Sequence, residues 1–480
     1  MSSRRGDTVS AVLFWAYLAL LLWVPIPLGS NRPWAWMVLE VWAYALLAAW
    51  VLAWALGRVE PTDALRRSSP AWLLLGAWLA LQLLHVVPMP ASWVAHLSPE
   101  AARMHALAAP MASGASETLS IDPHASLVSL YKSLAYAAVY FLALALMSRR
   151  SRIRTLARVL VYAAVANAVY AVLLHLADVN EDWFGTTIAQ GDSASGTYAN
   201  RNHFAGFLEM SLAIGIGLLI AGLSDRRADT WKRLLRHTID WILSPKMILR
   251  LALCILVIAL TTTHSRMGNT AFFSSLLIAG AIGIALSRHA TRNTVILLVS
   301  LVAIDLFIVG SWFGVERLAQ RLEQTTAQDV QQREEPSAYT LPLIRDYAVF
   351  GSGPGSFHVA FPRYRPPSVV NFFDYTHNDY VQFASESGIA GFLILGAFVA
   401  LALGAALVAQ WKRRDPLMRG MSFACIMGVT SILIHSWVDF NLQIPANASL
   451  FMVMLALGWI SLRHDRHPVP GLPNVREEDR

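Results

Sequence analysis

Charged residues are scarce in this sequence. They make up only 14% of its 480 residues, while hydrophobic residues make up 56% and the chain contains 17 tryptophans. Soluble globular domains carry about 25% charged residues, so the deficit excludes an ordinary soluble domain and indicates a membrane protein with interfacial aromatic belts. The formal net charge of +7 would suggest a nucleic acid partner only if the basic residues gathered on a soluble face, and they do not. We therefore expect no nucleic acid partner.

Cysteine and the common metal-binding motifs are also nearly absent. The two cysteines, Cys254 and Cys425, both fall in apolar runs, which excludes a disulfide framework on the outer side. No CxxC, HExxH or Asp-x-Asp pattern occurs, and the first outer loop, "VPIPLGSNRPW", has no carboxylate. Divalent ions that act on phosphates usually need carboxylate ligands. The sequence predicts no metal site and no cofactor.

Long apolar runs dominate what is present. Most reach the roughly 20 residues that cross a hydrocarbon core of about 30 Å, and every backbone group in such a core must be bonded internally, so we expect helices. The sequence predicts an all-α, polytopic integral membrane protein with about 12 transmembrane helices and one long periplasmic loop. The expected spans are 11–29, 33–55, 71–88, 127–147, 155–176, 203–223, 248–263, 270–287, 293–313, 388–410, 418–436 and 448–462.

Basic residues indicate how these helices are oriented. The short basic clusters "SRRSRIR", "WKRRDPLMR" and "LRHDRH" all fall on one side of the expected topology, and such clusters mark the cytoplasmic side. We expect a multi-pass protein of the bacterial inner membrane, with both termini cytoplasmic and most basic residues facing anionic membrane lipid. The first span has no small-residue cleavage site, so we interpret it as a retained anchor.

Two arginines and a histidine depart from this charge pattern. Arg201 lies in "GTYANRNHFAG", Arg266 in "TTTHSRMGN" and His377 in "DYTHNDYVQFASESG", and the expected topology places all three at the outer face, at or close to membrane depth. An arginine there is costly unless it is paired or faces a polar cavity. Taken singly, each arginine also fits an interfacial side chain that reaches the headgroups, and the histidine fits a helix cap or loop packing. Their shared depth within polar motifs favours a functional site.

A long outer loop, 314–377, leads to the third of these motifs. Structureless loops of this length are uncommon and usually functional. Its "GSGPGSF" stretch lacks the Lys and Ser/Thr of a phosphate-binding loop, so we interpret it as a tight turn. The loop also carries aromatic residues that would stack on sugars or pack against the bilayer. They are Phe357, Phe361, Tyr364, Phe372, Phe373 and Tyr375.

These motifs together resemble the O-antigen ligase/polymerase (Wzy_C-like) family of bacterial membrane glycosyltransferases. The resemblance is carried by "FGSGPGSF…FPRYRPP…YTHNDYVQFASESGIAG", by the two arginine motifs and by "HSWVDFNLQIPANA" at 435–448, and it extends over about 195–460. Five segments follow from this order. They are N-terminal helices 1–200, central helices 201–313 with both arginine motifs, the periplasmic loop 314–377, C-terminal helices 378–462 and a cytoplasmic tail 463–480.

The resemblance implies a metal-independent glycosyltransferase that acts at the outer face, with a glycan on undecaprenyl pyrophosphate as donor. Arg201 and Arg266 would bind the pyrophosphate, because the guanidinium fork fits phosphate oxygens and stays charged. His377 would accept the proton of an acceptor hydroxyl, since the ordinary pKa of imidazole suits neutral pH. Secondary candidates are Arg345, Asp379, His435 and Asp439, while His203 and His264 neighbour the two arginines.

Three functions remain open from the sequence. A ligase would move a finished glycan to lipid A-core, and a polymerase would join lipid-linked repeat units to a growing polysaccharide of the O-antigen or exopolysaccharide type. These two share the donor chemistry and differ in the acceptor. A transporter or flippase of the same lipid-linked sugar is the alternative from another class. Transporters place their charged residues near mid-membrane, whereas the candidates here gather at one face, which favours an enzyme.

Overall fold

The structure is a computed structural model that describes residues 2–108, 116–177, 179, 193–222, 245–286, 299–300, 336–367 and 369–464. Three predicted segments lie outside these described residues. They are the span expected at 293–313, apart from two residues, the beginning of the long loop up to residue 335, and the tail beyond residue 464.

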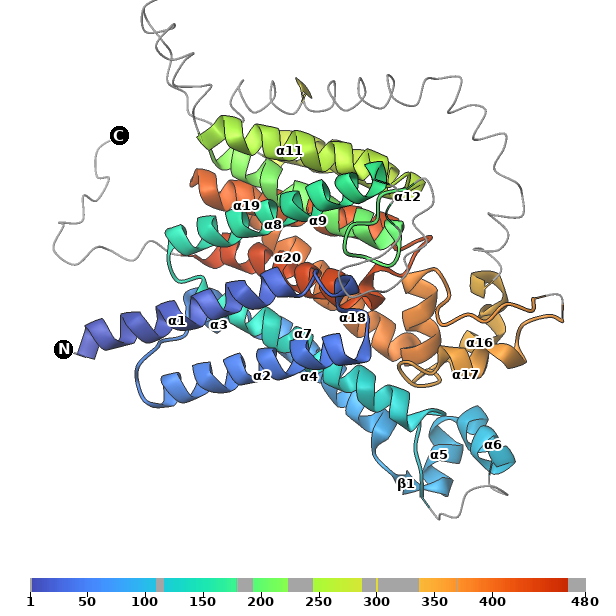
Figure 1. Cartoon of the computed structure of the whole chain (residues 1–480). Helices are drawn as coiled ribbons and strands as arrows, with labels where there is room; N and C mark the ends of the chain where they lie inside the picture. The colour runs from blue at the N-terminus through green and yellow to red at the C-terminus, as the bar shows by residue number, and fades with distance from the viewer. Residues whose placement is uncertain are drawn as a thin grey trace, which may run out of the picture.

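Long helices that lie side by side form most of the described chain (Figure 1). Ten of the described helices are long and apolar enough to cross a membrane, and an eleventh has a shorter apolar stretch at Met247–Thr262. This confirms an all-α, polytopic membrane protein. The long helices are α1 (Ser2–Trp23), α2 (Pro33–Ala55), α4 (Ser69–Val86), α7 (Pro123–Leu146), α8 (Arg150–Leu176), α9 (Arg201–Ala221), α11 (Pro245–Thr262), α12 (Arg266–Leu286), α18 (Asp379–Lys412), α19 (Pro416–His435) and α20 (Pro445–Arg463).

Short elements cover one end of this bundle. They are α5 (Ala91–Leu97), α6 (Pro99–Ala108), β1 (Met89–Pro90) paired antiparallel with β2 (Ser116–Glu117), α16 (Leu341–Asp346), α17 (Phe357–Ala360) and η3 (Phe361–Arg363). Val94, Leu119, Leu343 and Tyr347 belong to one small apolar cluster, which joins the α5–α6 segment to the α16–α17 segment. Figure 1 shows them at the right, opposite the start of α1 and the short α3 (Asp63–Arg66).

The opposite end gathers basic residues that bind neighbouring helices. Arg149 contacts Asp7 at 2.6 Å, Arg150 contacts Asp415 at 2.7 Å, and Arg152 donates to the hydroxyl of Ser10 at 2.8 Å. The beginnings of α1, α8 and α19 therefore share this end. The two ends of the bundle differ in chemistry as the positive-inside pattern requires, and the cytoplasmic placement of the basic end stays a prediction.

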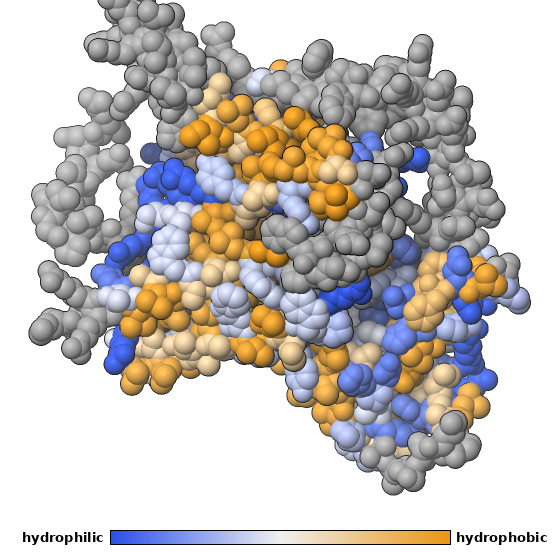
Figure 2. Space-filling view, in the orientation of Figure 1, coloured by the Kyte–Doolittle hydropathy of each residue, from blue (hydrophilic) through white to orange (hydrophobic). Residues whose placement is uncertain are grey.

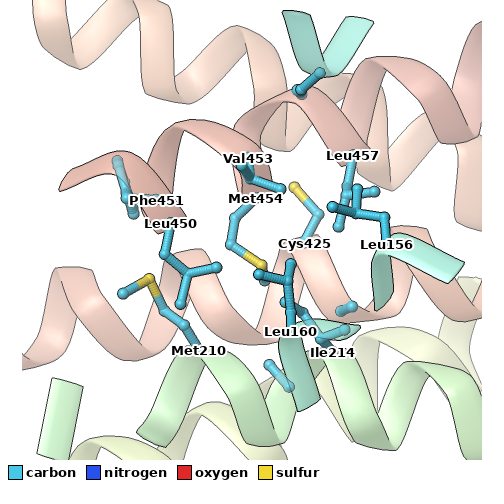
Figure 3. Packing of buried hydrophobic residues seen from close by; sticks show 14 of the residues in the cluster. Leu156, Leu160, Met210, Ile214, Cys425, Leu450, Phe451, Val453, Met454 and Leu457 are labelled. Carbon is cyan, nitrogen blue, oxygen red and sulfur yellow. The ribbon is translucent and has the colours of Figure 1, made fainter. Parts of the chain in front are cut away.

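Helices α9, α19 and α20 form the centre of the bundle. The apolar windows of α9 and α20 are 94% and 89% buried, whereas that of α2 is 28% buried. Figure 3 shows Met210 of α9, Cys425 of α19 and Met454 of α20 packed together. A Cβ on Gly217 would lie 2.3 Å from the carbonyl oxygen of Gly420, so small residues let α9 and α19 approach closely, as is usual in membranes.

The outer helices present apolar side chains instead. Val41 and Leu52 of α2 are 63% and 60% exposed, and Leu251 of α11 is 57% exposed. Figure 2 shows this apolar surface over α11 and α2. A surface of this kind fits lipid, in which backbone groups are bonded within each helix and side chains face hydrocarbon.

Candidate active site

The segment that contains His377 forms the start of α18. The side-chain oxygen of Asn378 accepts hydrogen bonds from the backbone N–H groups of Tyr380 at 3.0 Å and Val381 at 3.2 Å, so Asn378 is the N-cap. His377, immediately before it, has φ +56°. This conformation is uncommon for a residue with a side chain, and it makes the backbone turn sharply just before the cap.

Asp379 attaches this helix start to the loop 436–443, which lies between α19 and α20. Its buried carboxylate accepts hydrogen bonds from the hydroxyl of Ser436 at 2.8 Å, the N–H of Leu442 at 3.1 Å and the amide of Gln443 at 3.3 Å. All of these partners belong to the protein. The carboxylate of Asp379 therefore holds the two segments together, and its hydrogen bonds place it in the scaffold of the site.

Asp439 attaches the same loop to the first arginine motif. Its carboxylate accepts hydrogen bonds from the amide of Asn202 at 2.7 Å and contacts the ring of His203 at 3.2 Å. Burial alone would raise the pKa of the Asp439 carboxyl, but the hydrogen bond from His203 and the charges of His203 and His435 outweigh it and hold the pKa well below its usual range. A charged Asp439 therefore joins α9 to the loop before α20.

Phe440 packs between these motifs. Its ring centroid lies 4.6 Å from that of His203, 4.6 Å from that of Tyr375 in a stacked arrangement, and 4.9 Å from that of His377. One aromatic side chain thus contacts a residue from the first arginine motif and the predicted base from the third motif. The loop 436–443 is therefore what brings these two sequence-distant motifs to one place.

Arg201 is the first residue of α9 and is exposed. The side chain of Asn200 caps this helix through the N–H of Asn202 at 2.8 Å, and the Arg201 guanidinium donates to the hydroxyl of Ser193 at 2.6 Å. The N–H of Ala194 donates to the carbonyl of Thr262 at 3.0 Å. The segment that supports Arg201 therefore rests on the end of α11, at the beginning of the second arginine motif.

Arg266 is likewise the first residue of its helix, α12, and is exposed. The hydroxyl of Ser265 accepts a hydrogen bond from the N–H of Gly268 at 3.2 Å in the first turn. A Cβ on Gly268 would lie 2.6 Å from the Cβ of Ala205, so α12 begins in close contact with the second turn of α9. Both arginines thus stand at helix N-termini, where the helix dipole and unpaired N–H groups favour anions.

A fully buried acid–base pair lies among the same helices. The carboxylate of Glu209 contacts Nδ1 of His435 at 2.8 Å and accepts a hydrogen bond from the hydroxyl of Ser431 at 2.6 Å. His435 was expected as a secondary candidate, whereas Glu209 was not recognised from the sequence. Glu209 could have been recognised as a carboxylate inside an apolar helix, because a charged residue in such a segment is rare and usually paired.

The glycine-rich stretch forms the expected tight turn. Gly351, Gly353 and Gly355 have φ values of +82°, +111° and +82°, a region that glycine adopts without strain. The N–H of Phe357 donates to the carboxylate of Glu386 at 3.1 Å. The turn therefore binds an acidic group of the protein itself, on α18.

Arg345 stands apart from the cluster. It lies exposed on α16, and within the described ranges the hydrogen bonds that join Asp379, Asp439 and their partners do not include it. Among the residues that the structure describes, no group of three or more His, Cys, Asp or Glu side chains is placed to hold a metal ion.

Comparison with known proteins supports the resemblance found in the sequence. Residues 251–396 match the family model described as O-antigen ligase (Wzy_C), and no curated protein matches the chain. The matched range contains Arg266, Arg345 and His377. Arg201 and Asp439 lie outside the matched range, so the link between the first arginine motif and the His377 segment rests on the contacts of Asp439 and Phe440.

Proposed function

We propose that the chain is an O-antigen ligase-like glycosyltransferase. It moves a glycan from undecaprenyl pyrophosphate to a hydroxyl group of lipid A-core at the periplasmic face. One observation carries the proposal. The loop 436–443, through Asp439 and Phe440, holds the first arginine motif against the His377 segment. A phosphate-binding helix end and a base are then within one site.

The reaction divides between the two arginines and the histidine. Arg201 and Arg266 hold the pyrophosphate through charge-assisted hydrogen bonds at the starts of α9 and α12. His377 accepts the proton of the acceptor hydroxyl as its oxygen bonds to the anomeric carbon. The bond from that carbon to the phosphate oxygen breaks, and the leaving pyrophosphate keeps the electron pair. The guanidinium groups stabilise the charge that develops on it.

The positive charge of the two arginines would stabilise the pyrophosphate, as a divalent ion does in many phosphate-transfer sites. We therefore propose that the reaction needs no metal and no cofactor. Its partners are the lipid-linked donor, the glycan acceptor and the surrounding inner-membrane lipid. The proposed orientation has both termini cytoplasmic, which puts the site end of the bundle in the periplasm.

A polymerase of O-antigen or exopolysaccharide repeats would use the same donor site with a growing polysaccharide as acceptor. The flippase alternative has less support, because Arg201, Arg266 and His377 all lie at helix starts at one end of the bundle. Charged residues for transport are expected near mid-membrane.

Two measurements test the proposal. Purified protein in liposomes, with a lipid-linked donor and lipid A-core in excess chelator, should form the linked product. Loss of turnover that magnesium or manganese restores would contradict the metal-independent mechanism. In a deletion strain, lipid-linked polymer that accumulates unattached indicates a ligase, whereas attached glycans of a single repeat indicate a polymerase. Normal glycans in that strain would overturn both.

A further inference from the structure

A second candidate site adjoins the segment that contains His377. It is a cavity of about 400 Å³ between α4, α7, α18 and α20, a volume within the roughly 300–1,000 Å³ of small-molecule sites. Neither α9 nor α12 contributes to its lining. The cavity is therefore distinct from the place where the two arginines would hold the pyrophosphate.

The deep part of the cavity is apolar. It is lined by Trp78, Ile394, Phe398, Phe451 and Leu455, among others. Ala125 and Tyr136 both line the cavity and are eleven residues apart on α7, which in a helix corresponds to about 16 Å. The cavity thus extends well along the helix axis, into the part of the bundle that is expected in hydrocarbon. An apolar chain fits this part, since its burial is favourable.

The mouth of the cavity is polar and carries both charge signs. Lys132, Asp374 and Glu386 line it. The ammonium group of Lys132 already lies 3.7 Å from the centroid of the Trp36 ring, so it is engaged by an aromatic face. One ammonium group that already contacts an aromatic face, with two acidic side chains beside it, offers little positive charge to a phosphate head. Hydroxyl groups, in contrast, donate readily to carboxylates.

Gln82 supplies an unused acceptor in the same wall. It is only 1% exposed, its amide nitrogen donates to the hydroxyl of Ser133 at 2.7 Å, and its side-chain oxygen Oε1 is buried without a hydrogen-bond partner. A buried acceptor without a donor costs free energy. A hydroxyl group in the cavity would remove that cost.

The mouth also adjoins the proposed base. Tyr375, two residues before His377, lines the cavity and stacks on Phe440, whose ring packs against His377. Gln443 lines it from the loop that Asp379 anchors. A hydroxyl-bearing head in this mouth is therefore next to the side chain that would take its proton.

We infer that this cavity binds the acceptor, and that the acceptor is a saccharide carried on a lipid chain. The inference rests on the proposed function, in which His377 activates a sugar hydroxyl. The chain of the acceptor lies between α4, α18 and α20, its hydroxyl groups face Gln82 and Glu386, and the donor pyrophosphate occupies the separate site at Arg201 and Arg266.

A binding experiment on the full chain tests the site without relying on turnover. In liposomes, dodecyl glucoside with a diazirine at the chain end should label peptides 394–399 and 451–455 on irradiation. Leu74→Trp fills the cavity from α4, whereas Leu73→Trp is the matched control, since Leu73 is 76% exposed and is not a lining residue. We expect about tenfold less labelling in Leu74→Trp, the equivalent of about two methylene groups losing their burial, and unchanged labelling in Leu73→Trp.

A phosphatidic acid with the same photoreactive chain distinguishes the head groups. Weak labelling of the same peptides supports the inference, and labelling equal to that by the glucoside overturns it, because any bilayer lipid would then fill the cavity. Ser129→Phe, which fills the cavity from α7, replaces Leu74→Trp if that variant does not insert. Absence of labelling in the unmodified protein would also overturn the site.

Kinetics then separate the acceptor from the donor. With glycolipid acceptor extracted from the deletion strain, Leu74→Trp should raise the KM for the acceptor about tenfold and leave the KM for the donor unchanged. A raised KM for the donor alone would assign the cavity to the donor's chain and overturn the acceptor site. If the unmodified protein transfers no glycan at all, the proposed function fails, while the labelling result stands by itself.

Discussion

The carboxylate of Asp439 accepts a hydrogen bond from the side-chain amide of Asn202 at 2.7 Å, although 237 positions separate the two residues. Asn202 directly follows Arg201, and Phe440 directly follows Asp439 and contacts His377. This bond therefore joins the helix start that carries Arg201 to the loop whose Phe440 contacts His377.

Asp439→Ala should destabilise the protein and greatly lower its activity. Removing one partner of a buried charged pair costs about 3–5 kcal/mol, because Asn202 and His203 lose their shared acceptor. The thermal unfolding temperature in detergent and the kcat of glycan transfer measure the two effects. Asp7→Ala is the control, since the ion pair of Asp7 with Arg149 is exposed and such pairs contribute little. An Asp439→Ala variant as stable as Asp7→Ala would contradict the role given to Asp439.

The stabilisation by Asp439 should depend on pH in one direction. The pKa of this carboxyl is lowered in the folded protein, so its contribution is fully present above the ordinary aspartate pKa of about 4 and is lost as the pH falls toward the folded-state value. The difference in unfolding temperature between the unmodified protein and Asp439→Ala should be fully present at about pH 5 and shrink below about pH 4. A difference that grows on acidification would reverse this sign.

His377→Ala should remove catalysis and spare donor binding. General-base catalysis contributes typically about 10²–10⁴-fold, so kcat should fall by that factor while the Kd of the lipid pyrophosphate stays nearly unchanged. Added imidazole should restore part of the activity. His96→Ala serves as control, because His96 is exposed on α5. Near-normal turnover in a correctly inserted His377→Ala protein would leave the "THND" motif as a helix cap alone.

The arginine variants should affect the donor instead. Arg266→Ala should weaken binding of the lipid pyrophosphate by roughly ten- to a hundredfold, the value of one charge-assisted hydrogen bond. Arg201→Lys keeps the charge but loses the planar fork, so its turnover should still be strongly reduced. Titration of labelled donor measures the first and product formation the second. Arg103→Ala, on the exposed side of α6, should match the unmodified protein in both.

Gly388→Ala should disrupt the start of α18, whereas Gly396→Ala in the same helix should not. Gly388 has φ +61° and ψ −171°, and a Cβ there would lie 2.2 Å from the carbonyl oxygen of Val349. That conformation is almost confined to glycine and costs about 1–3 kcal/mol with a side chain, before the collision is counted. A Cβ on Gly396 meets nothing within 4 Å. Unfolding temperatures in detergent should fall only for Gly388→Ala, and equal values would show that the break in α18 is dispensable.

Most of the fold could be predicted from the sequence, because the bilayer permits few solutions. A long apolar run in hydrocarbon must be a helix, so α2, α4 and α20 lie within a few residues of the expected spans. The break in α18 at Gly388 was not predicted. It depends on backbone contacts with Val349, which no local pattern reveals. The span at 293–313 stays a prediction.

The candidate site, like the fold, has some features that the sequence predicts and others that depend on the tertiary structure. The sequence by itself determined that Arg201, Arg266 and His377 lie in polar motifs next to apolar runs, because only apolar runs can form the spans. The structure shows that the helices begin at Arg201, Arg266 and Asp379. Only the tertiary structure decided that Asp379 and Asp439 hold one loop between two motifs, and that Glu209 pairs with His435. Those bonds join residues that are far apart in the chain. Their geometry is set by how closely α9, α12 and α19 pack. That packing depends on side chains from all three helices at once.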